Sequence, residues 1–188
     1  MRVISGSFKG KKIFEPKDNK TRPLKDLAKE SIFNIIEHSN KFDAQLIDSN
    51  ILDLFSGVGS FGIECLSRGS KKVVFVENYS GVLPILKKNL LSLKSIKNYE
   101  ILENDIYNDK VLSKLNNKFD IIFLDPPFRD KNLNEFLSRL KNFEILNKNG
   151  VIVIHRHKND DDNFSKKFKV VDEKKYGISK ISFLINLN

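Results

Sequence analysis

The stretch that most constrains this chain is Ile121–Arg129, which reads IIFLDPPFR. Its four apolar residues, led in by Phe119 and Asp120, predict a strand buried on both faces of a parallel sheet. Two consecutive prolines cannot continue the hydrogen-bond ladder of a sheet, so we expect the strand to end at Asp125. Ligands of open α/β sheets bind beyond the carboxyl ends of the strands, and this places Asp125 to Phe128 at the mouth of a candidate site.

The tetrapeptide Asp125-Pro126-Pro127-Phe128 suits chemistry on the amino group of a nucleobase. That nitrogen is a poor nucleophile because its lone pair is delocalised into the ring. If the Asp125 carboxylate and the Pro126 carbonyl each accept one N–H, the lone pair turns towards an electrophile, and the fixed φ of proline holds the carbonyl rigid. Phe128 would stack on the base. The alternative interpretation is a Pro-Pro turn that carries an exposed phenylalanine and no ligand.

Length and composition limit the number of domains and the class of protein. A chain of 188 residues, 40% of them hydrophobic, is enough for one domain with a full core. We expect a β-hairpin and helix over residues 1–45, on the substrate side of an α/β domain over residues 46–188. One cysteine, no long apolar run and an N-terminus without a signal-peptide pattern lead us to expect a cytoplasmic protein outside any membrane.

The formal net charge of +9 and the pI near 9.5 indicate an anionic partner, nucleic acid first. A second explanation competes with this one. Lysine, asparagine and isoleucine are abundant throughout the chain, as in proteins from AT-rich genomes, and such drift raises the pI without any partner. The charge alone therefore favours RNA or DNA only modestly.

From residue 51 onwards, short apolar runs alternate with segments of helical periodicity. We expect strands at Ile51–Phe55, Lys71–Glu77, Tyr99–Glu103, Ile121–Leu124, Gly150–His155, Phe168–Asp172 and Ile178–Leu187. We expect helices at Leu24–His38, Ser60–Ser67, Tyr79–Leu93, Asp109–Leu115 and Asn132–Lys141, with Pro84 in the first turns of the third helix or at its true start. This alternation predicts an α/β Rossmann-like fold, whose mainly parallel seven-stranded sheet takes one antiparallel strand from the closing hairpin.

The N-terminal residues Arg2–Pro16 form two alternating runs around Lys9-Gly10, which predicts a β-hairpin with glycine in the turn. Arg22, just before the first helix, and Arg129, directly after the Pro-Pro turn, are candidates for contact with nucleic acid. The basic side chains of the hairpin are candidates too, and they are Arg2, Lys9, Lys11 and Lys12. A lysine-rich edge strand is also an ordinary protection against aggregation, so both interpretations stay open.

A glycine-rich loop, Gly57–Gly62, follows the strand expected at Ile51–Phe55 and opens a helix. It matches the pattern G-x-G-x-x-G, and Glu77 lies 20 residues beyond Gly57 at the end of the next strand. In dinucleotide-binding proteins the glycines approach a pyrophosphate and the acid binds the ribose. S-adenosylmethionine sites use the same arrangement for the amino-acid end and the ribose of that cofactor. The loop alone does not discriminate, and tight strand-to-helix packing without a ligand is a third interpretation.

Two further features favour S-adenosylmethionine. Asp53 lies inside the run Asp-Leu-Phe-Ser-Gly, where its carboxylate can hold the ammonium group of the cofactor. Asn104 and Asp105 follow the third strand, where a carboxylate can accept a hydrogen bond from the adenine amino group. The DPPF tetrapeptide then supplies a substrate site at the next strand, whereas a dehydrogenase would have no use for it.

The chain resembles the bacterial 16S ribosomal RNA guanine-N2 methyltransferases of the RsmD type. The resemblance covers nearly the whole length, through RVISGSFKGKKI, TRPLKDLAKESIFNII, DLFSGVGSFGIE, FVE, NDIY, DPPF and YGISKISFL. It implies methyl transfer from S-adenosylmethionine to the N2 amino group of one guanine in 16S rRNA, on a partly assembled small subunit. We also expect the protein to be a monomer. The resemblance also implies cofactor contacts from Asp53, Phe55, Ser56, Gly57, Gly59, Glu77, Asn104 and Asp105, and base contacts from Asp125, Pro126, Pro127 and Phe128.

Two segments depart from the pattern of this family. The first helix carries Leu27-Ala28-Lys29 where the family is usually richer in arginine, and the fifth strand ends in His155-Arg156-His157 where an acidic residue is expected. The two histidines can share one face of the strand, but the sequence shows no third metal ligand near them, and we expect no metal. Asp160–Asp162 is expected in a solvated loop or at a helix start, and Cys65 in the core.

Three alternative functions stay open at this point. The nearest is the same transfer to another acceptor, such as adenine N6 in DNA or RNA, and both Asp125 and the whole-chain resemblance argue against it. The second is a nucleotide-binding oxidoreductase, which would bind NADH rather than adenosylhomocysteine. The third is an RNA-binding module without catalysis, which the complete set of site residues disfavours.

Overall fold

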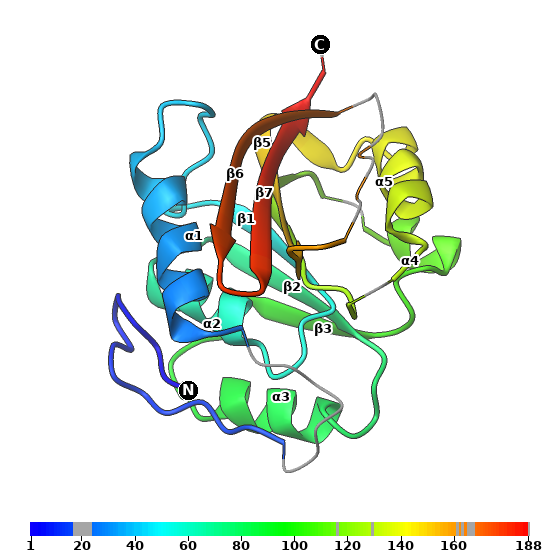
Figure 1. Cartoon of the computed structure of the whole chain (residues 1–188). Helices are drawn as coiled ribbons and strands as arrows, with labels where there is room; N and C mark the ends of the chain where they lie inside the picture. Colours follow the sequence, from blue (N-terminus) through cyan, green and yellow to red (C-terminus); the bar gives the residue numbers. More distant parts are fainter. Residues whose placement is uncertain are drawn as a thin grey trace.

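The computed structural model describes residues 1–16, 24–115, 117–128, 130–160, 162, 164 and 168–187. Within these residues seven strands form one sheet in the order β3-β2-β1-β4-β5-β7-β6 (Figure 1). The strands are β1 (Asn50–Leu54), β2 (Lys72–Glu77), β3 (Tyr99–Glu103), β4 (Phe119–Leu124), β5 (Leu146–His157), β6 (Phe168–Tyr176) and β7 (Ser179–Asn186). The helices are α1 (Asp26–His38), α2 (Ser60–Ser67), α3 (Leu83–Leu91), α4 (Asp109–Leu112) and α5 (Leu133–Asn142). None of these described helices is long and apolar enough to cross a membrane.

Strands β1 to β5 run parallel, and β7 is antiparallel to both of its neighbours, β5 and β6. The predicted α/β fold, with a mainly parallel sheet and one antiparallel strand, is confirmed. Strands β2 and β3 lie on one side of β1, and β4 and β5 lie on the other. Leu54 pairs in register with both Val76 and Leu124, so β1, β2 and β4 end at the same level. The strand order therefore reverses direction at β1, and open α/β sheets bind ligands at such a switch point.

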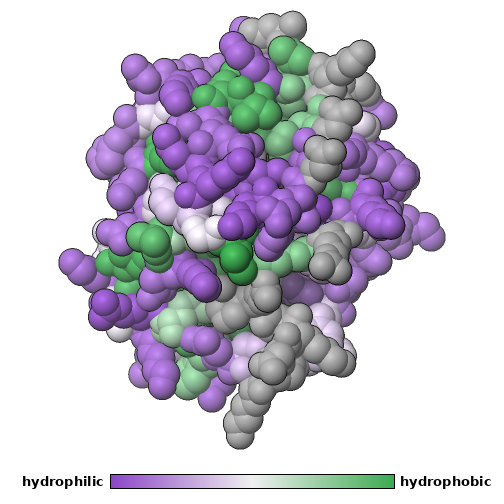
Figure 2. Space-filling view, in the orientation of Figure 1, coloured by the Kyte–Doolittle hydropathy of each residue, from purple (hydrophilic) through white to green (hydrophobic). Residues whose placement is uncertain are grey.

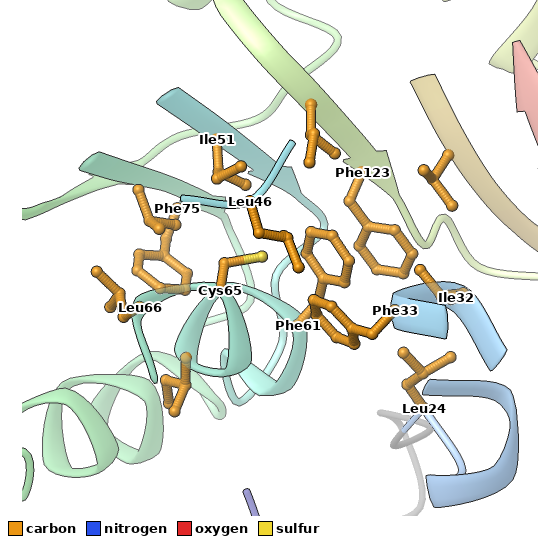
Figure 3. Packing of buried hydrophobic residues seen from close by; sticks show 14 of the residues in the cluster. Leu24, Ile32, Phe33, Leu46, Ile51, Phe61, Cys65, Leu66, Phe75 and Phe123 are labelled. Atoms are coloured by element: carbon orange, nitrogen blue, oxygen red, sulfur yellow. The ribbon is translucent and has the colours of Figure 1, made fainter. Parts of the chain in front are cut away.

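Helices cover both faces of the sheet, with α1, α2 and α3 on one face and α4 and α5 on the other (Figure 1). Successive side chains of a strand point to opposite faces, so Ile51 packs in the first layer and Leu52 in the second. Three stacked rings join the first layer (Figure 3). The Phe61 ring of α2 lies 5.1 Å from Phe33 of α1 and 4.1 Å from Phe123 of β4, measured between centroids. Both faces of the sheet are therefore buried, which explains its nearly continuous apolar strands.

Two strands are longer than the sequence predicts. β5 begins at Leu146 rather than Gly150, because a shift of register against β4 lets Leu146 pair with Phe119. β6 continues to Tyr176, which pairs with Ser179 across a turn of only two residues. Both differences come from pairing with a neighbouring strand, which the periodicity of one segment does not reveal.

The helices follow the predicted periodicity, with small changes at their ends. α2 spans the predicted residues, and α1 begins at Asp26 rather than Leu24. α3 begins at Leu83 rather than Tyr79, with Pro84 in its first turn. The missing N–H of proline removes no helical hydrogen bond at that position, so Pro84 marks the true start of the helix. Cys65 of α2 is buried in the core, as predicted.

The N-terminal segment forms only the open end of the predicted β-hairpin, where the Val3 N–H donates to the Lys11 carbonyl at 2.9 Å and the Ile13 N–H donates to the Met1 carbonyl at 3.0 Å. In its described part, Arg2 and Lys12 form an isolated antiparallel bridge, and no strand is built on either side of it. Beyond this bridge the backbone turns towards α2. The backbone N–H groups of Ile4 and Ser5 each donate to the Glu64 carboxylate at 2.8 Å. From Ile4 onwards, contacts with a helix therefore replace the hydrogen bonds of a longer hairpin.

The next residues of this segment contact the end of the same helix. The Ser7 N–H donates to the Ser67 carbonyl at 2.8 Å, and the Phe8 N–H donates to the Ser67 hydroxyl at 3.0 Å. Gly6 adopts a φ of +79°, and a Cβ at this position would lie 1.9 Å from the Ser67 carbonyl oxygen. Glycine is therefore required for this close approach, and the segment lies on α2 instead of projecting from the domain.

A buried ion pair lies beneath this contact. Lys29 of α1 is fully buried, its Nζ lies 3.8 Å from Oε2 of Glu64, and it donates to the Arg2 carbonyl at 2.8 Å. Burial lowers the pKa of Lys29, and the Glu64 carboxylate opposes that shift. Glu64 also accepts from Nε of Arg68 at 3.0 Å. One carboxylate therefore joins α1, α2 and the N-terminal segment.

We expect Glu64→Ala to lower the free energy of unfolding by about 3 to 5 kcal/mol. The substitution leaves the Lys29 ammonium and two backbone N–H groups buried without their acceptor. Denaturation with urea measures the loss. Glu100→Ala is the matched control, because Glu100 pairs with Lys72 at 2.7 Å with both side chains largely exposed, and its cost should stay below about 1 kcal/mol. Equal costs for the two variants would contradict this role of Glu64.

Candidate functional site

The carboxyl ends of β1, β2 and β4 open into a cleft of about 1180 Å³. Each of these strands contributes one carboxylate to its lining: Asp53, Glu77 and Asp125. Other predicted site residues that line it are Phe55, Ser56, Gly57, Pro126, Pro127 and Phe128. A smaller cavity of about 230 Å³, at the amino ends of β4 and β5, contains none of the predicted site residues. The fold therefore brings most of the predicted site together in one place.

The glycine-rich loop turns from β1 into α2. Phe55 opens the turn with a φ of 58°, a left-handed conformation that phenylalanine rarely adopts. A Cβ at Gly62 would lie 2.3 Å from the Phe75 ring, and one at Gly59 would lie 2.6 Å from a side chain of α3. These two glycines allow close packing of α2. Gly57 lines the cleft and has no atom within 4 Å of its Cβ position in the described structure, so this glycine leaves room for a ligand.

Asp53 is almost completely buried at the cleft. Its Oδ2 accepts from the Gly62 N–H at 3.0 Å, whereas its buried Oδ1 has no hydrogen-bond partner among the residues that the structure describes. Burial raises the pKa of Asp53 well above its ordinary value, and the Asp125 and Glu77 carboxylates raise it further. A cation bound in the cleft would supply the partner that Oδ1 lacks. The site therefore fits an ammonium group, as the sequence predicts.

Glu77 ends β2 and binds the glycine-rich loop. Its Oε2 accepts from the Gly57 N–H at 2.8 Å. Its Oε1 accepts from the backbone N–H groups of Asn78 at 2.9 Å and Tyr79 at 2.8 Å. Three bonds occupy most of the acceptor capacity of a carboxylate, which has about four lone-pair sites, and leave room for one hydroxyl donor. Glu77 thus shapes the loop in addition to being a candidate ligand.

Asp125 lies directly after β4, and its side chain is 20% exposed. Its Oδ1 lies 2.8 Å from Nδ1 of His155, and Nε2 of His155 lies 2.9 Å from Oγ of Ser179. Both partners also line the cleft, and sequence reasoning assigned neither of them this role. The position of His155 in its strand is the sequence signal that could have indicated this contact. Leu124 pairs with Ile154, so the residues that follow them in β4 and β5 are neighbours.

Arg156 supports the loop that carries the tetrapeptide. Its guanidinium donates to the carbonyls of Pro127 at 3.1 Å and Asp130 at 2.9 Å. Its Nε lies 3.3 Å from the Asp160 carboxylate and 3.1 Å from that of Asp162. Both carboxylates are largely buried, because they compensate a buried guanidinium, so the predicted solvated loop is wrong for these two residues.

Phe128 lies at the rim of the cleft beside two histidines. Its ring centroid lies 5.3 Å from that of His157 and 6.0 Å from that of His155, both in edge-to-face geometry. Both nitrogens of His155 already have protein partners. Across the described ranges of the chain, no three His, Cys, Asp or Glu side chains are grouped to hold a metal ion. The histidines therefore belong to the aromatic wall of the cleft.

Three predicted cofactor residues do not line the cleft: Gly59, which packs against α3, and Asn104 and Asp105. Asn104 and Asp105 follow β3 with exposed side chains, and the lining of the cleft does not include them. The Asp105 carboxylate accepts from the Tyr107 N–H at 2.9 Å and closes a turn after the strand. A contact between Asp105 and an adenine amino group stays a prediction.

The predicted RNA-binding residues have different environments. Arg2, Lys9 and Lys12 are exposed. Lys11 is partly buried, because its ammonium donates to the Ser92 carbonyl beside the end of α3. The face of the molecule in Figure 2 is mainly hydrophilic, with apolar side chains in separate patches. The remaining predicted residues, Arg22 and Arg129, lie outside the described residues.

Comparison with known proteins assigns the chain to a family. The model of the family described as "Conserved hypothetical protein 95" matches residues 1–185. The chain belongs to this family. "Putative rRNA methyltransferase YlbH" of Bacillus subtilis is 38% identical over 81% of this chain and 80% of its own length. "Ribosomal RNA small subunit methyltransferase D" of Haemophilus influenzae is 32% identical over 95% of this chain and 90% of its own.

Solved structures agree with the sequence relatives of the Conserved hypothetical protein 95 family. "Putative methyltransferase yhhF from Escherichia coli" superposes with a TM-score of 0.80 at 26% identity, covering 99% of this chain and 97% of that one. The family match and these relatives confirm the predicted RsmD-type family. The methyltransferase type of Rossmann-like fold is confirmed with it.

We expect Asp53→Asn to raise the melting temperature of the ligand-free protein at neutral pH. Asparagine keeps an acceptor for the Gly62 N–H and removes a buried charge. Because the folded-state pKa of Asp53 is raised, the wild type loses stability as the pH rises from the unfolded pKa of about 3.9 towards the folded value. The advantage of the variant should therefore grow with pH over that interval.

Thermal unfolding of the wild type and Asp53→Asn across a pH series measures this difference. Asp53→Ala is the control, since it removes the charge but leaves the Gly62 N–H without its acceptor, and it should melt below Asp53→Asn. An advantage of Asp53→Asn that is independent of pH would contradict the raised pKa of Asp53.

Proposed function

We propose that this chain is an S-adenosylmethionine-dependent methyltransferase that modifies the N2 amino group of a guanine in 16S rRNA of the small ribosomal subunit. One observation carries the proposal. A single cleft is lined both by Asp53, whose Oδ1 lacks a partner within the described structure, and by the loop Asp125–Phe128. Asp53 suits the ammonium group of the cofactor, and the loop Asp125–Phe128 suits the amino group of a base. The rRNA methyltransferase names of two relatives support this assignment.

The residues of β1, β2 and the glycine-rich loop fit the cofactor. Asp53 would hold its ammonium group, Glu77 has acceptor capacity for a ribose hydroxyl, and Gly57 leaves space above the loop. When bound, S-adenosylmethionine supplies an electrophilic methyl group on a sulfonium centre. The protein supplies position, because the carboxylates and the loop hold the donor at one side of the cleft.

The loop after β4 fits the amino group of the base. His155 occupies Oδ1 of Asp125, which leaves the other carboxylate oxygen for one N–H of the amine. The Pro127 carbonyl already accepts from Arg156 and from the Asp130 N–H, so the Pro126 carbonyl is the better acceptor for the second N–H. Two such acceptors turn the lone pair of the nitrogen towards the methyl group.

The carboxylate of Asp125 favours guanine over adenine. Guanine presents two donors side by side, N1–H and the N2 amino group, and an ionised carboxylate only accepts. Adenine presents an N1 lone pair beside its N6 amino group, and that lone pair would face the carboxylate. This difference in the edge of the base disfavours adenine N6, which is the nearest alternative acceptor.

The transfer itself depends on alignment. Bound S-adenosylmethionine would supply the methyl group, an N–C bond to the guanine nitrogen would form as the S–C bond breaks, and the alkylated amine would lose a proton to solvent or to Asp125. The amine becomes acidic on alkylation, so no strong base is needed. The rate gain comes from holding the two reacting atoms in line, which can contribute about 7 kcal/mol or more.

The target guanine must leave its stack to enter the cleft. Enzymes that act on a base atom extrude the nucleotide or use single-stranded segments, and aromatic side chains receive the exposed base face. Phe128 lines the cleft and can stack on the face of the exposed base. The net charge of +9 and the exposed Arg2, Lys9 and Lys12 suit a phosphate backbone.

The direct test is methylation of a defined substrate. Purified protein, labelled S-adenosylmethionine and small-subunit particles from cells that lack the gene should yield N2-methylguanosine after nuclease digestion and mass spectrometry. Protein-free 16S rRNA and large-subunit particles are run in parallel. Label in N6-methyladenosine, or in large-subunit RNA alone, would overturn the proposal.

We expect Asp125→Ala to reduce kcat by on the order of a hundredfold or more, because a positioned acceptor of the reacting amine is lost. Adenosylhomocysteine affinity should change little, since Asp125 is assigned to the base. Asp130→Asn is the matched control at the other end of the same loop, where the Asp130 carboxylate binds the Asn132 N–H and the Tyr107 hydroxyl. Near-normal turnover of Asp125→Ala would remove this residue from the site.

Salt dependence tests the basic N-terminal segment. If Lys9 and Lys12 contact phosphates, replacing both with Gln should lower the salt slope of RNA binding by about 0.7–0.9 for each lost contact. Lys11 is kept because its ammonium binds Ser92. Lys148→Gln, an exposed lysine at the opposite end of the sheet, is the control. If the double variant binds the small-subunit particle like the wild type at every salt concentration, these lysines do not contact RNA.

A further inference from the structure

The side chain of His155 connects three strands at the wall of the cleft. It lies in β5, is almost completely buried, and contacts Asp125 after β4 through Nδ1 at 2.8 Å. Its Nε2 lies 2.9 Å from the hydroxyl of Ser179, the first residue of β7 and itself buried. The sequence singles out His155 only as a departure from the acidic residue expected there. The contact with Asp125 gives this departure a use at the site.

The two hydrogen bonds define the protonation of the ring. An ionised carboxylate only accepts, so Nδ1 of His155 must carry the proton and donate to Asp125. The Ser179 hydroxyl can donate to Nε2 when the ring is neutral, and can accept from it when the ring is charged. In both states the N–H bond points from His155 to Asp125. The proton on Nδ1, and with it the direction of this hydrogen bond, is therefore fixed by Asp125, and Ser179 is compatible with it in both states.

This arrangement excludes His155 as a base for the reacting amine. Nδ1 carries a proton and faces Asp125, while Nε2 faces Ser179. Neither nitrogen therefore presents a lone pair to a substrate in the cleft. What His155 can do is hold the Asp125 carboxylate, whose terminal torsion is otherwise broad and roughly two-fold.

We propose that His155 is a positioning residue for Asp125: it binds Oδ1 and so aims the other carboxylate oxygen at the base amino group. The proposal rests on the proposed function, because it assigns the free oxygen to that reaction. Ser179 orients the ring in turn, as second partners of functional histidines commonly do. His155, which stands where an acidic residue is expected, would then support the same reaction through a different side chain.

The test compares two substitutions of His155. His155→Leu removes both hydrogen bonds, and it should lower kcat for the small-subunit particle by about tenfold to a hundredfold, the scale of a misplaced reacting group. His155→Asn places an N–H close to the position of Nδ1 and should recover most of that loss. KM for the particle and adenosylhomocysteine affinity should stay close to wild type in both variants, because neither depends on the aim of Asp125.

Substitutions of two serines on β7 distinguish a loss of His155 ring orientation from a general loss of packing. Ser179→Ala removes the partner of Nε2 and should lower kcat by less than His155→Leu does. Ser182→Ala is the matched control, because the hydroxyl of this buried serine donates to Glu173 at 3.2 Å rather than to the His155 ring. Thermal unfolding of every variant checks that it is folded. If His155→Leu does not fold, a normal kcat for Ser179→Ala overturns the proposal.

The outcomes distinguish this inference from the function on which it rests. If the wild type methylates no guanine in the small-subunit particle, the proposed function fails and the inference fails with it. If the wild type is active and Asp125→Ala is not, a normal kcat for His155→Leu overturns the inference alone. Equal losses in His155→Leu and His155→Asn would also overturn it, since they would show that the N–H bond does not matter.

Discussion

Three carboxylates meet where β1, β2 and β4 end at the same level, and the cleft depends on how their charges are compensated. Glu77 accepts three backbone N–H groups, which also shape the glycine-rich loop. Asp125 is bound by His155. Within the described residues Asp53 accepts from the Gly62 N–H alone, and its burial and its charged neighbours raise its pKa. The residue with the least compensation is the one assigned to a cationic ligand, which gives binding a physical driving force.

The surroundings of the cleft are held by buried polar contacts between segments far apart in sequence. Arg156 binds two carbonyls of the loop after β4. Glu64 binds the N-terminal segment to α2. Asn89 of α3 accepts from the Phe14 N–H at 2.8 Å and donates to the carbonyls of Phe14 and Val58 at 3.0 Å each. The basic N-terminal segment is thereby attached to the glycine-rich loop, so the candidate RNA surface and the candidate cofactor loop share one rigid support.

The sequence predicts the fold class and the centre of the site because both depend on local pattern. Asp53 lies within an apolar run, Glu77 and Asp125 follow such runs directly, and parallel strands place their ends at one edge. The role of His155 depends on the register between β4 and β5, and the pairing of Glu64 with Lys29 depends on how two helices pack. Such long-range contacts leave no periodic signal, which is why the N-terminal hairpin is shorter than predicted and these partners are missed.

We propose that the cleft binds S-adenosylmethionine through Asp53 and does not bind a dinucleotide. Calorimetric titration of the protein with adenosylhomocysteine and with NADH, in two buffers of different ionisation enthalpy, tests it most directly. We predict one adenosylhomocysteine bound per chain, no NADH, and a buffer-dependent heat at pH values below the raised pKa of Asp53, because an ammonium bound at Asp53 favours its charged form and releases a proton. The Asp53→Asn protein should bind more weakly and without that proton. Binding of NADH, or adenosylhomocysteine affinity unchanged by Asp53→Asn, would contradict the claim.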